Sequence, residues 1–184
     1  VLFRSEFRLP LHEGRSVTRY NRALAEGATR SLQRVALSRE DVAFLQYTGG
    51  TTGVSKGATL SHGNLVANVL QCEAWFAPEL ATLGDTQPVI VCALPLYHIF
   101  ALTLCALLAT RVGMLNLLIV NARDIRGLIQ TLSGHRVHVF PAVNTLFNAL
   151  ATEPDFARLD FTELRLSIGG GMAVQKATAE AWLK

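Results

Sequence analysis

A loop rich in glycine and hydroxyl residues carries the clearest chemistry in the sequence. The segment from Tyr47 to Gly57 contains four glycines, four Ser or Thr residues and one lysine, but no acidic residue. Because glycine permits positive φ, successive backbone N–H groups in such a loop can turn inward and surround an anion. The hydroxyls add donors and the lysine adds a positive charge. These groups predict a polyphosphate site formed by Thr48, Gly49, Gly50, Thr51, Thr52, Gly53, Ser55 and Lys56.

Spacing excludes two common phosphate loops. A Walker A loop has a glycine directly before its lysine, whereas here Ser55 precedes Lys56 and Gly57 follows it. The dinucleotide fingerprint opens a helix, whereas residues 58–60 have the pattern of a returning strand. A plain Gly/Thr hairpin turn is the structural alternative, but surface turns rarely combine four hydroxyls and a lysine without Asp, Asn or Pro.

Strands and helices alternate after this loop. Apolar runs predict strands at 89–93, 115–120, 137–140 and 164–168. Helical spacing predicts helices at 61–76, 99–110, 144–151 and 174–182, and one more that Asp124 caps. Ser61 is expected to cap the first helix, and Pro78 to end it. The alternation predicts an α/β fold of βαβ units with a largely parallel, buried sheet.

Two further motifs follow strands of this sheet. In such sheets ligands collect beyond the carboxyl ends of the strands. His98 follows the strand at 89–93, and three glycines, residues 169–171, follow the strand at 164–168. The structural alternatives are a core histidine and a tight turn. His12, His62, His135 and His138 lack a comparable setting, so we interpret them as structural.

Composition limits the class of protein. Half of the 184 residues are hydrophobic and 17% are charged, fewer than in most soluble domains, so much of the chain is expected to be interior. Eight arginines and four glutamates fall within residues 1–40, which predicts a basic, solvated and partly irregular leader. Its arginines have no aromatic residues interleaved, which argues against nucleic-acid binding. Three cysteines without C-x-x-C spacing predict free thiols in a reducing compartment, with neither a disulfide scaffold nor a metal site, and no signal peptide opens the chain.

One uncharged stretch is long enough to cross a bilayer. Residues 86–110 contain no charged side chain, but Pro88, Pro95, Tyr97 and His98 interrupt the first half. A buried strand followed by a buried helix explains the pattern better.

The loop and its neighbours resemble a known family. The segment 47–57 is similar to the signature loop of the AMP-forming acyl-adenylate enzymes, with Gly49 where many members have Ser and Ser55 where many have Pro. Residues 44–46 and 95–100 resemble the bacterial long-chain fatty-acid–CoA ligase branch. The resemblance covers residues 41–184, which we expect to be part of the large N-terminal adenylation domain, with the C-terminal domain absent.

The resemblance also implies roles for individual residues. Thr51, Lys56 and His98 would be catalytic, with Thr51 and Lys56 meeting the phosphates and His98 approaching the reacting carboxyl group. Tyr97 and Phe100 would line the acyl site. Adenine would pack on the bare backbone of Gly170, Gly171 and Met172, although Ala173 stands where relatives commonly have Pro. Residues 141–150 resemble a stretch beside the acyl tunnel.

The implied enzyme is a ligase that activates a fatty acid with ATP to acyl-AMP and then transfers the acyl group to coenzyme A. Mg²⁺ is implied too, but its glutamate, the ribose-binding aspartate and the C-terminal lysine belong beyond residue 184. We therefore expect residues 1–184 alone to be inactive, to lack a metal ligand set and to need the rest of the enzyme. The resemblance implies a cytoplasmic protein with small-molecule substrates and leaves open peripheral contact with the inner membrane and the oligomeric state. The alternatives are another adenylate former, such as an acyl-AMP ligase or an amino-acid adenylation domain, and a non-catalytic apolar or membrane module.

Overall fold

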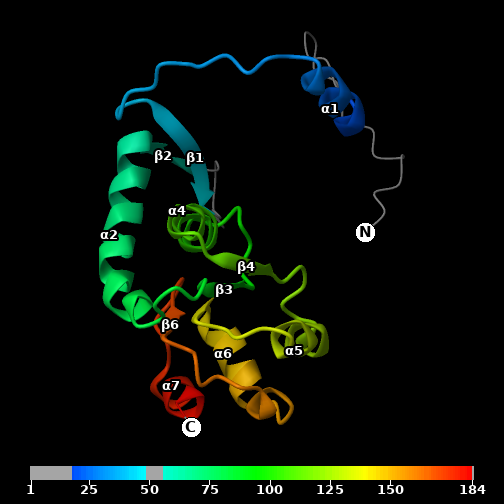
Figure 1. The fold of residues 1–184 in the computed structure, drawn as a ribbon, viewed down its shortest axis with the longest axis vertical. Coiled ribbons are helices and arrows are strands. Elements are labelled where there is room, and N and C mark those ends of the chain that lie inside the picture. The colour runs from blue at the N-terminus through cyan, green and yellow to red at the C-terminus, as the bar shows by residue number, and fades with distance from the viewer. Residues whose placement is uncertain (1–17, 49–55, 184) are drawn as a thin grey trace. The chain divides into compact units, whose positions relative to one another are not determined.

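The structure is a computed structural model that describes residues 18–48 and 56–183. The chain divides into two compact units, Val1–Leu37 and Ser38–Lys184. The described part of the first unit contains one helix, α1 (Tyr20–Ala28), on which no residue is buried. The solvated leader expected over residues 1–40 stays a prediction, since residues 1–17 lie outside the described residues. All other elements belong to the second unit (Figure 1).

An antiparallel hairpin opens the second unit. Strand β1 (Val42–Thr48) pairs with β2 (Lys56–Ser61), and the pairing brings Thr48 opposite Lys56. The returning strand expected at 58–60 is therefore confirmed. Residues 49–55, which connect the two strands, lie outside the described residues.

Helix α2 (His62–Ala81) begins without any connecting loop. Ser61 is both the last residue of β2 and the N-cap of α2, where its Oγ accepts a hydrogen bond from the Asn64 N–H at 3.2 Å. Asn64 Oδ1 accepts in return from the Ser61 N–H at 3.0 Å, which completes a capping box. The prediction that Pro78 ends this helix is wrong. The helix continues to Ala81 because Pro78 falls in its last turn, where the missing N–H costs one bond and Leu80 still packs on the core.

Four strands form the parallel sheet that the sequence predicts. They are β3 (Val89–Cys92), β4 (Leu115–Leu118), β5 (Val139–Ala142) and β6 (Leu166–Gly169), in the order β4-β3-β5-β6. Every neighbouring pair is parallel. β5 starts two residues later than expected and includes Pro141, which pairs with Ile168 of β6 but has no bridge to β3, so no hydrogen bond to β3 is lost there. β6 also starts two residues later than expected, and β4 ends two residues earlier.

The helix predicted at 99–110 is one continuous helix of mixed geometry. Its turns are α3 (Ile99–Ala101), a π-helical segment η1 (Leu102–Leu108) and α4 (Ala109–Val112). The remaining elements are α5 (Ile125–Ser133), α6 (Asn144–Ala151), the 3₁₀ turn η2 (Phe156–Arg158) and α7 (Lys176–Trp182). Asp124 caps α5 as predicted, since its Oδ1 accepts from the Gly127 N–H at 3.0 Å.

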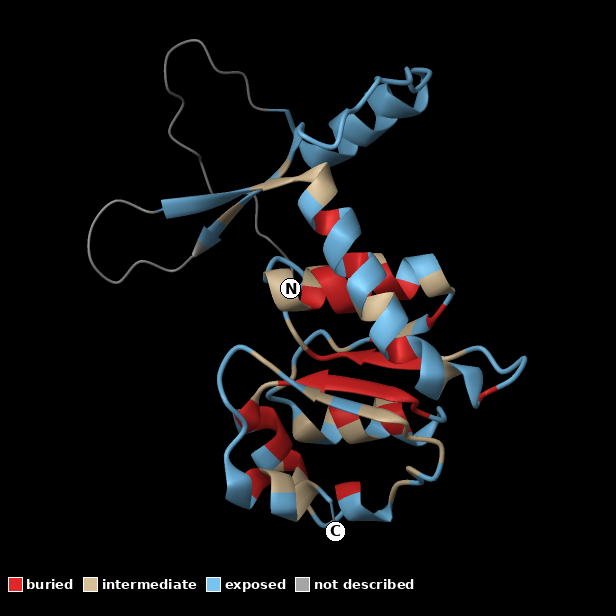
Figure 2. Ribbon diagram, turned by 90° about the vertical axis from the view of Figure 1, so that its left-hand side faces the viewer, coloured by how far each residue is buried: buried red, intermediate tan, exposed pale blue. Residues whose placement is uncertain are grey.

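Helices cover both faces of the sheet (Figure 2). Alternate strand residues point to opposite faces, so Ile90 and Val139 pack with α2 and the 99–112 helix, while Val91 and Phe140 pack with α5 and α6. The core between the sheet and helices α5 and α6 includes the aromatic rings of Phe140, Phe147, Phe156 and Trp182, which contact one another. The sheet is therefore fixed from both sides, and its strand ends are held in place for the site.

Candidate functional site

The sheet opens at the carboxyl ends of β3, β4 and β5. The segment after β3 passes to the face that α2 covers, whereas those after β4 and β5 pass to the other face. Strands β3 and β5 form one bridge, between Ile90 and Val139, and the two strands are no longer paired beyond it. Such a switch of direction is where ligands bind in parallel α/β sheets.

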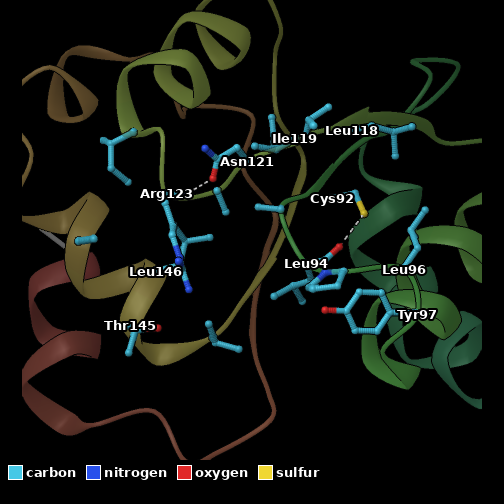
Figure 3. A pocket seen from close by; sticks show the side chains of 17 residues that line it. Cys92, Leu94, Leu96, Tyr97, Leu118, Ile119, Asn121, Arg123, Thr145 and Leu146 are labelled. Carbon is cyan, nitrogen blue, oxygen red and sulfur yellow. Dashed lines mark hydrogen bonds between the residues drawn. The ribbon is translucent and has the colours of Figure 1, made fainter. Parts of the chain in front are cut away.

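A groove of about 1040 Å³ lies at this opening (Figure 3). Its lining is mostly apolar, with polar groups at Tyr97, Asn121, Arg123 and Thr145. Asn121 Oδ1 accepts from the Arg123 N–H at 3.1 Å, which fixes the turn that carries the Arg123 side chain. This combination suits an apolar ligand portion with a charged or polar end. The groove is lined by Cys92, Ala93, Leu94, Pro95, Leu96, Tyr97, Leu118, Ile119, Val120, Asn121, Ala122, Arg123, Ile125, Val143, Thr145, Leu146 and Ala149.

The segment Pro95–Phe100, here called the His98 corner, contributes its first three residues to the lining of the groove, whereas His98 lines neither the groove nor the smaller hollow next to Phe100. The His98 N–H donates to the Pro95 carbonyl at 2.9 Å, which closes a turn. The imidazole then caps α3, because His98 Nδ1 accepts from the Phe100 N–H at 3.3 Å. A neutral ring that accepts at Nδ1 carries its proton on Nε2, so Nε2 can donate to a ligand. His98 is exposed in the structure.

Phe100 connects the His98 corner to the triple glycine. A Cβ built on Gly170 would lie 2.7 Å from two atoms of the Phe100 ring, so the ring covers the side of Gly170 that lacks a side chain. The Gly170 N–H donates to the Ala142 carbonyl at 3.3 Å, and Gly171 has a φ of +79°. Glycine is thus favoured at 170 by the close approach of the Phe100 ring and at 171 by the positive φ. Met172, the last residue of this predicted set, is exposed.

The two aromatic residues predicted to line the acyl site face different hollows. Tyr97 lines the large groove, whereas Phe100 lines a second hollow of about 340 Å³. The second hollow lies between α2 and the start of the 99–112 helix, and is lined by Leu60, Asn64, Leu65, Asn68, Ile99, Phe100 and Thr103. Tyr97 and Phe100 therefore lie on two sides of the His98 corner, and His98 stands between them in the chain.

The structure describes only part of the predicted phosphate loop. Lys56 is exposed at the start of β2, opposite the end of β1. The predictions for Gly49, Gly50, Thr51, Thr52, Gly53 and Ser55 lie outside the described residues, as does the side chain of Thr48.

Sequence reasoning missed Gln46. Its Nε2 donates to the backbone carbonyl of Tyr97 at 2.9 Å, so the hairpin contacts the His98 corner directly. No local pattern could have shown this bond, because its partners are 51 residues apart.

His138, unlike His98, has the setting of a structural residue. His138 is 2% exposed, as a core histidine should be, and its Nδ1 accepts from the Val89 N–H at 2.9 Å. Burial lowers the pKa of His138 below its usual value. Cys72, Cys92 and Cys105 are free thiols, as predicted, and burial raises the pKa of the Cys72 thiol.

The described residues contain neither a cluster of metal ligands nor a helix suited to a membrane. Within residues 18–48 and 56–183, no three or more His, Cys, Asp or Glu side chains gather as a metal site would need. No helix in the same ranges is both long enough and apolar enough to span a bilayer.

The parallel sheet and the groove at its carboxyl ends define an α/β protein of the nucleotide- and ligand-binding kind. The sequence matches the family described as "AMP-binding enzyme" over residues 9–184. Since this match covers nearly the whole chain, the protein belongs to the AMP-binding enzyme family.

Several curated relatives within this family are similar to the chain. The chain is 48% identical over 164 residues to the long-chain-fatty-acid–CoA ligase of Haemophilus influenzae, which covers 89% of this chain and 29% of that protein. It is 49% identical over 165 residues to the enzyme of the same name from Escherichia coli O6:H1, covering 90% and 29%. Similarity to 4-coumarate–CoA ligase CCL1 of Humulus lupulus is lower, 32% over 158 residues, covering 86% and 28%. The chain therefore spans less than a third of the length of these relatives.

Solved structures show the same fold. The ATP-bound structure of MatB from Rhodopseudomonas palustris superposes with a TM-score of 0.66 at 26% identity, over 88% of this chain and 30% of that one. The N-terminal domain of FACL13 from Mycobacterium tuberculosis superposes with a TM-score of 0.69 at 24% identity, over 88% and 39%. The expected fold class, part of an acyl-CoA synthetase N-terminal domain, is thereby confirmed.

Proposed function

We propose that the protein is an AMP-forming long-chain fatty-acid–CoA ligase, and that residues 41–184 are part of its adenylation domain. The observation that carries this proposal is the identity of 48–49% with ligases of that name over about nine-tenths of the chain. The 4-coumarate ligase, which is named for an aromatic acid, is only 32% identical. This difference favours a fatty acid over an aromatic acid as substrate.

The proposed reaction has two steps. A fatty carboxylate oxygen attacks the α-phosphorus of ATP, and the bond to pyrophosphate breaks, giving acyl-AMP. The thiol of coenzyme A then attacks the acyl carbonyl, loses its proton, and displaces AMP. In the first step charge accumulates on the leaving pyrophosphate, so donors placed beside it lower the barrier.

The described residues of the predicted site have positions that fit the proposed roles. Lys56 stands at the end of the hairpin, opposite Thr48. Together with residues 49–55, which lie outside the described residues, it would bind the β- and γ-phosphates. His98 would donate from Nε2 to the reacting carboxyl group, because Nδ1 is occupied by the Phe100 N–H. The backbone of Gly170 and Gly171 would lie beside adenine, and the apolar hollows beside Tyr97 and Phe100 would take the acyl chain.

Mg²⁺ is also part of the proposal. This ion is usually held by one or two carboxylates together with substrate phosphates. Residues 18–48 and 56–183 contain no group of three or more His, Cys, Asp or Glu side chains, so they offer no metal site that is complete without the phosphates.

The cellular compartment of the protein is proposed from its cysteine thiols. Three free cysteines suit a reducing compartment such as the cytoplasm. Its partners would be a fatty acid, ATP and coenzyme A, with peripheral contact at the inner membrane as a further part of the proposal.

Replacing Lys56 in the full-length enzyme tests the phosphate assignment, and the other variants are likewise made in the full-length enzyme. Lys56→Ala should slow pyrophosphate exchange, which measures acyl-AMP formation, by about 10- to 100-fold, since a hydrogen bond to a charged group contributes about 1.5–3 kcal/mol. Fatty-acid binding, measured by calorimetry, should change little. The matched control is Lys176→Ala, because Lys176 is an exposed lysine paired with Glu180 on α7. Equal exchange rates in both variants would contradict the phosphate role, and a wild-type protein that activates only amino acids or aromatic acids would contradict the fatty-acid assignment.

A further inference from the structure

One hydrogen bond joins the two halves of the candidate site. Gln46 Nε2 on β1 donates to the Tyr97 carbonyl at 2.9 Å. Among the residues that the structure describes, it is the only hydrogen bond between the hairpin and the segment after β3. The base of the hairpin is held differently, because the His62 and Gly63 N–H groups donate to the carbonyls of Asp41 and Arg39 at 3.0 and 2.8 Å.

Gln46 lies close to the phosphate end of the hairpin. It pairs with Ala58, and two residues further along the ladder Thr48 pairs with Lys56. Two residues of extended strand span about 7 Å. A bond at Gln46 therefore fixes β1 two residues before the pair that contains Lys56. The backbone bonds at Asp41 and Arg39 act at the opposite end of the hairpin.

The other end of the bond lies on a rigid turn. Tyr97 directly precedes His98, whose N–H bonds to the Pro95 carbonyl at 2.9 Å and whose carbonyl accepts from the Leu102 N–H at 2.9 Å. The imidazole is fixed in turn by the Phe100 N–H. Because these bonds connect the corner internally, a displacement of the Tyr97 carbonyl moves His98 with it. Tyr97 itself is visible at the wall of the groove in Figure 3.

We propose that Gln46 is a positioning residue that sets the distance between the phosphate-binding end of the hairpin and His98. This inference rests on the proposed function, because it assigns the phosphates to the hairpin and the carboxyl group to His98. In-line attack needs the carboxylate and the α-phosphorus at one fixed separation, and small misplacements are costly to the rate. Gln46 contributes that alignment without touching either substrate.

The test replaces Gln46 by methionine, which has a similar length but no donor. The matched control is Gln87→Met, because Gln87 Nε2 also donates to a backbone carbonyl, that of Gly113 at 3.0 Å, away from the site. Gln46→Met should lower kcat for pyrophosphate exchange by about two- to tenfold, the usual contribution of one such bond, with little change in KM for ATP. Gln87→Met should leave kcat unchanged.

A second measurement separates positioning from a general loss of structure. In a His98→Ala background, Gln46→Met should have almost no further effect on kcat, because the group that it positions is gone. Hydrogen exchange of the amides at His98 and Leu102 should be faster in Gln46→Met and unchanged in Gln87→Met.

Three results would overturn the inference. They are equal kcat values in Gln46→Met and Gln87→Met, a full Gln46→Met effect in the His98→Ala background, and unchanged exchange at His98 and Leu102. Failure of the proposed function is distinguishable, because the wild-type protein would then form no acyl-AMP. The exchange measurement would still decide whether Gln46 holds the corner.

Discussion

Gly170→Ala is the substitution whose effect the structure specifies most closely. A methyl group at this position would lie 2.7 Å from two carbons of the Phe100 ring and 3.0 Å from a third. Carbon atoms pack at about 3.5–4.0 Å, so the ring has to move by close to 1 Å. The atoms in conflict are at the far end of a side chain, and the hollow of about 340 Å³ beside Phe100 offers space for the movement.

This setting predicts a loss of stability at the low end of the range for overpacked cores. Insertions into a packed core cost about 1–3 kcal/mol, and the adjoining hollow favours a loss near 1 kcal/mol. For a domain of this size, such a loss lowers Tm by about 2–4 °C. The ring would then occupy part of the hollow, so fatty-acid binding should weaken more than the stability loss alone suggests.

Thermal unfolding and fatty-acid binding of the purified variants measure these two effects. Gly134→Ala is the control, because a Cβ there has only the Thr131 carbonyl oxygen near it, at 4.0 Å, and φ is −89°. Phe100→Leu, which removes the ring, should recover the lost stability when combined with Gly170→Ala. If Gly170→Ala unfolds at the same temperature as Gly134→Ala, or if Phe100→Leu gives no recovery, the packing explanation for this glycine is wrong.

Two further predictions concern histidines. His98→Ala should lower pyrophosphate exchange with fatty acids of all chain lengths, while Tm falls by no more than a few degrees. The fall in Tm is expected to be small because His98 is exposed and its one described side-chain bond caps the first turn of a helix. A large fall in Tm with unchanged specific activity would contradict its role. His138 has a pKa below its usual 6.5 because it is buried, so the unfolded chain takes up the proton more readily and stability should fall as the pH drops below about 6.5. In His138→Asn, whose Oδ1 can still accept from the Val89 N–H, the free energy of unfolding measured between pH 7 and 5 should depend less on pH; an equal dependence in both proteins would exclude His138 as its source.

Local patterns predicted most of the elements. The caps at Ser61 and Asp124 are formed by side chains next to the helices that they begin, so the sequence alone reveals them. The prediction that α2 ends at Pro78 failed because the end of this helix depends on distant contacts. A proline near the end of a helix loses only one hydrogen bond, and the tertiary packing of Leu80, which no local pattern contains, decides whether the helix continues.

The site was predictable in its residue types but not in its contacts. The strand-end rule correctly brought the His98 corner and the triple glycine to one edge of the sheet. The contact of Phe100 with Gly170 and the bond of Gln46 to Tyr97 both join residues more than 50 positions apart. Their geometry depends on strand order, which the sequence pattern left open between several arrangements.

The junction between β2 and α2 also limits how the length of this chain can vary. Since Ser61 ends the strand and caps the helix, one inserted residue there would rotate α2 by about 100° relative to the hairpin. Val69 and Phe76 would then turn away from the core that they now fill. The connection between Ala81 and β3 does not join its two elements directly, and it is exposed at Gly84. Insertions and deletions accumulated during divergence are therefore expected between α2 and β3, and tags or fused domains are best introduced at that connection.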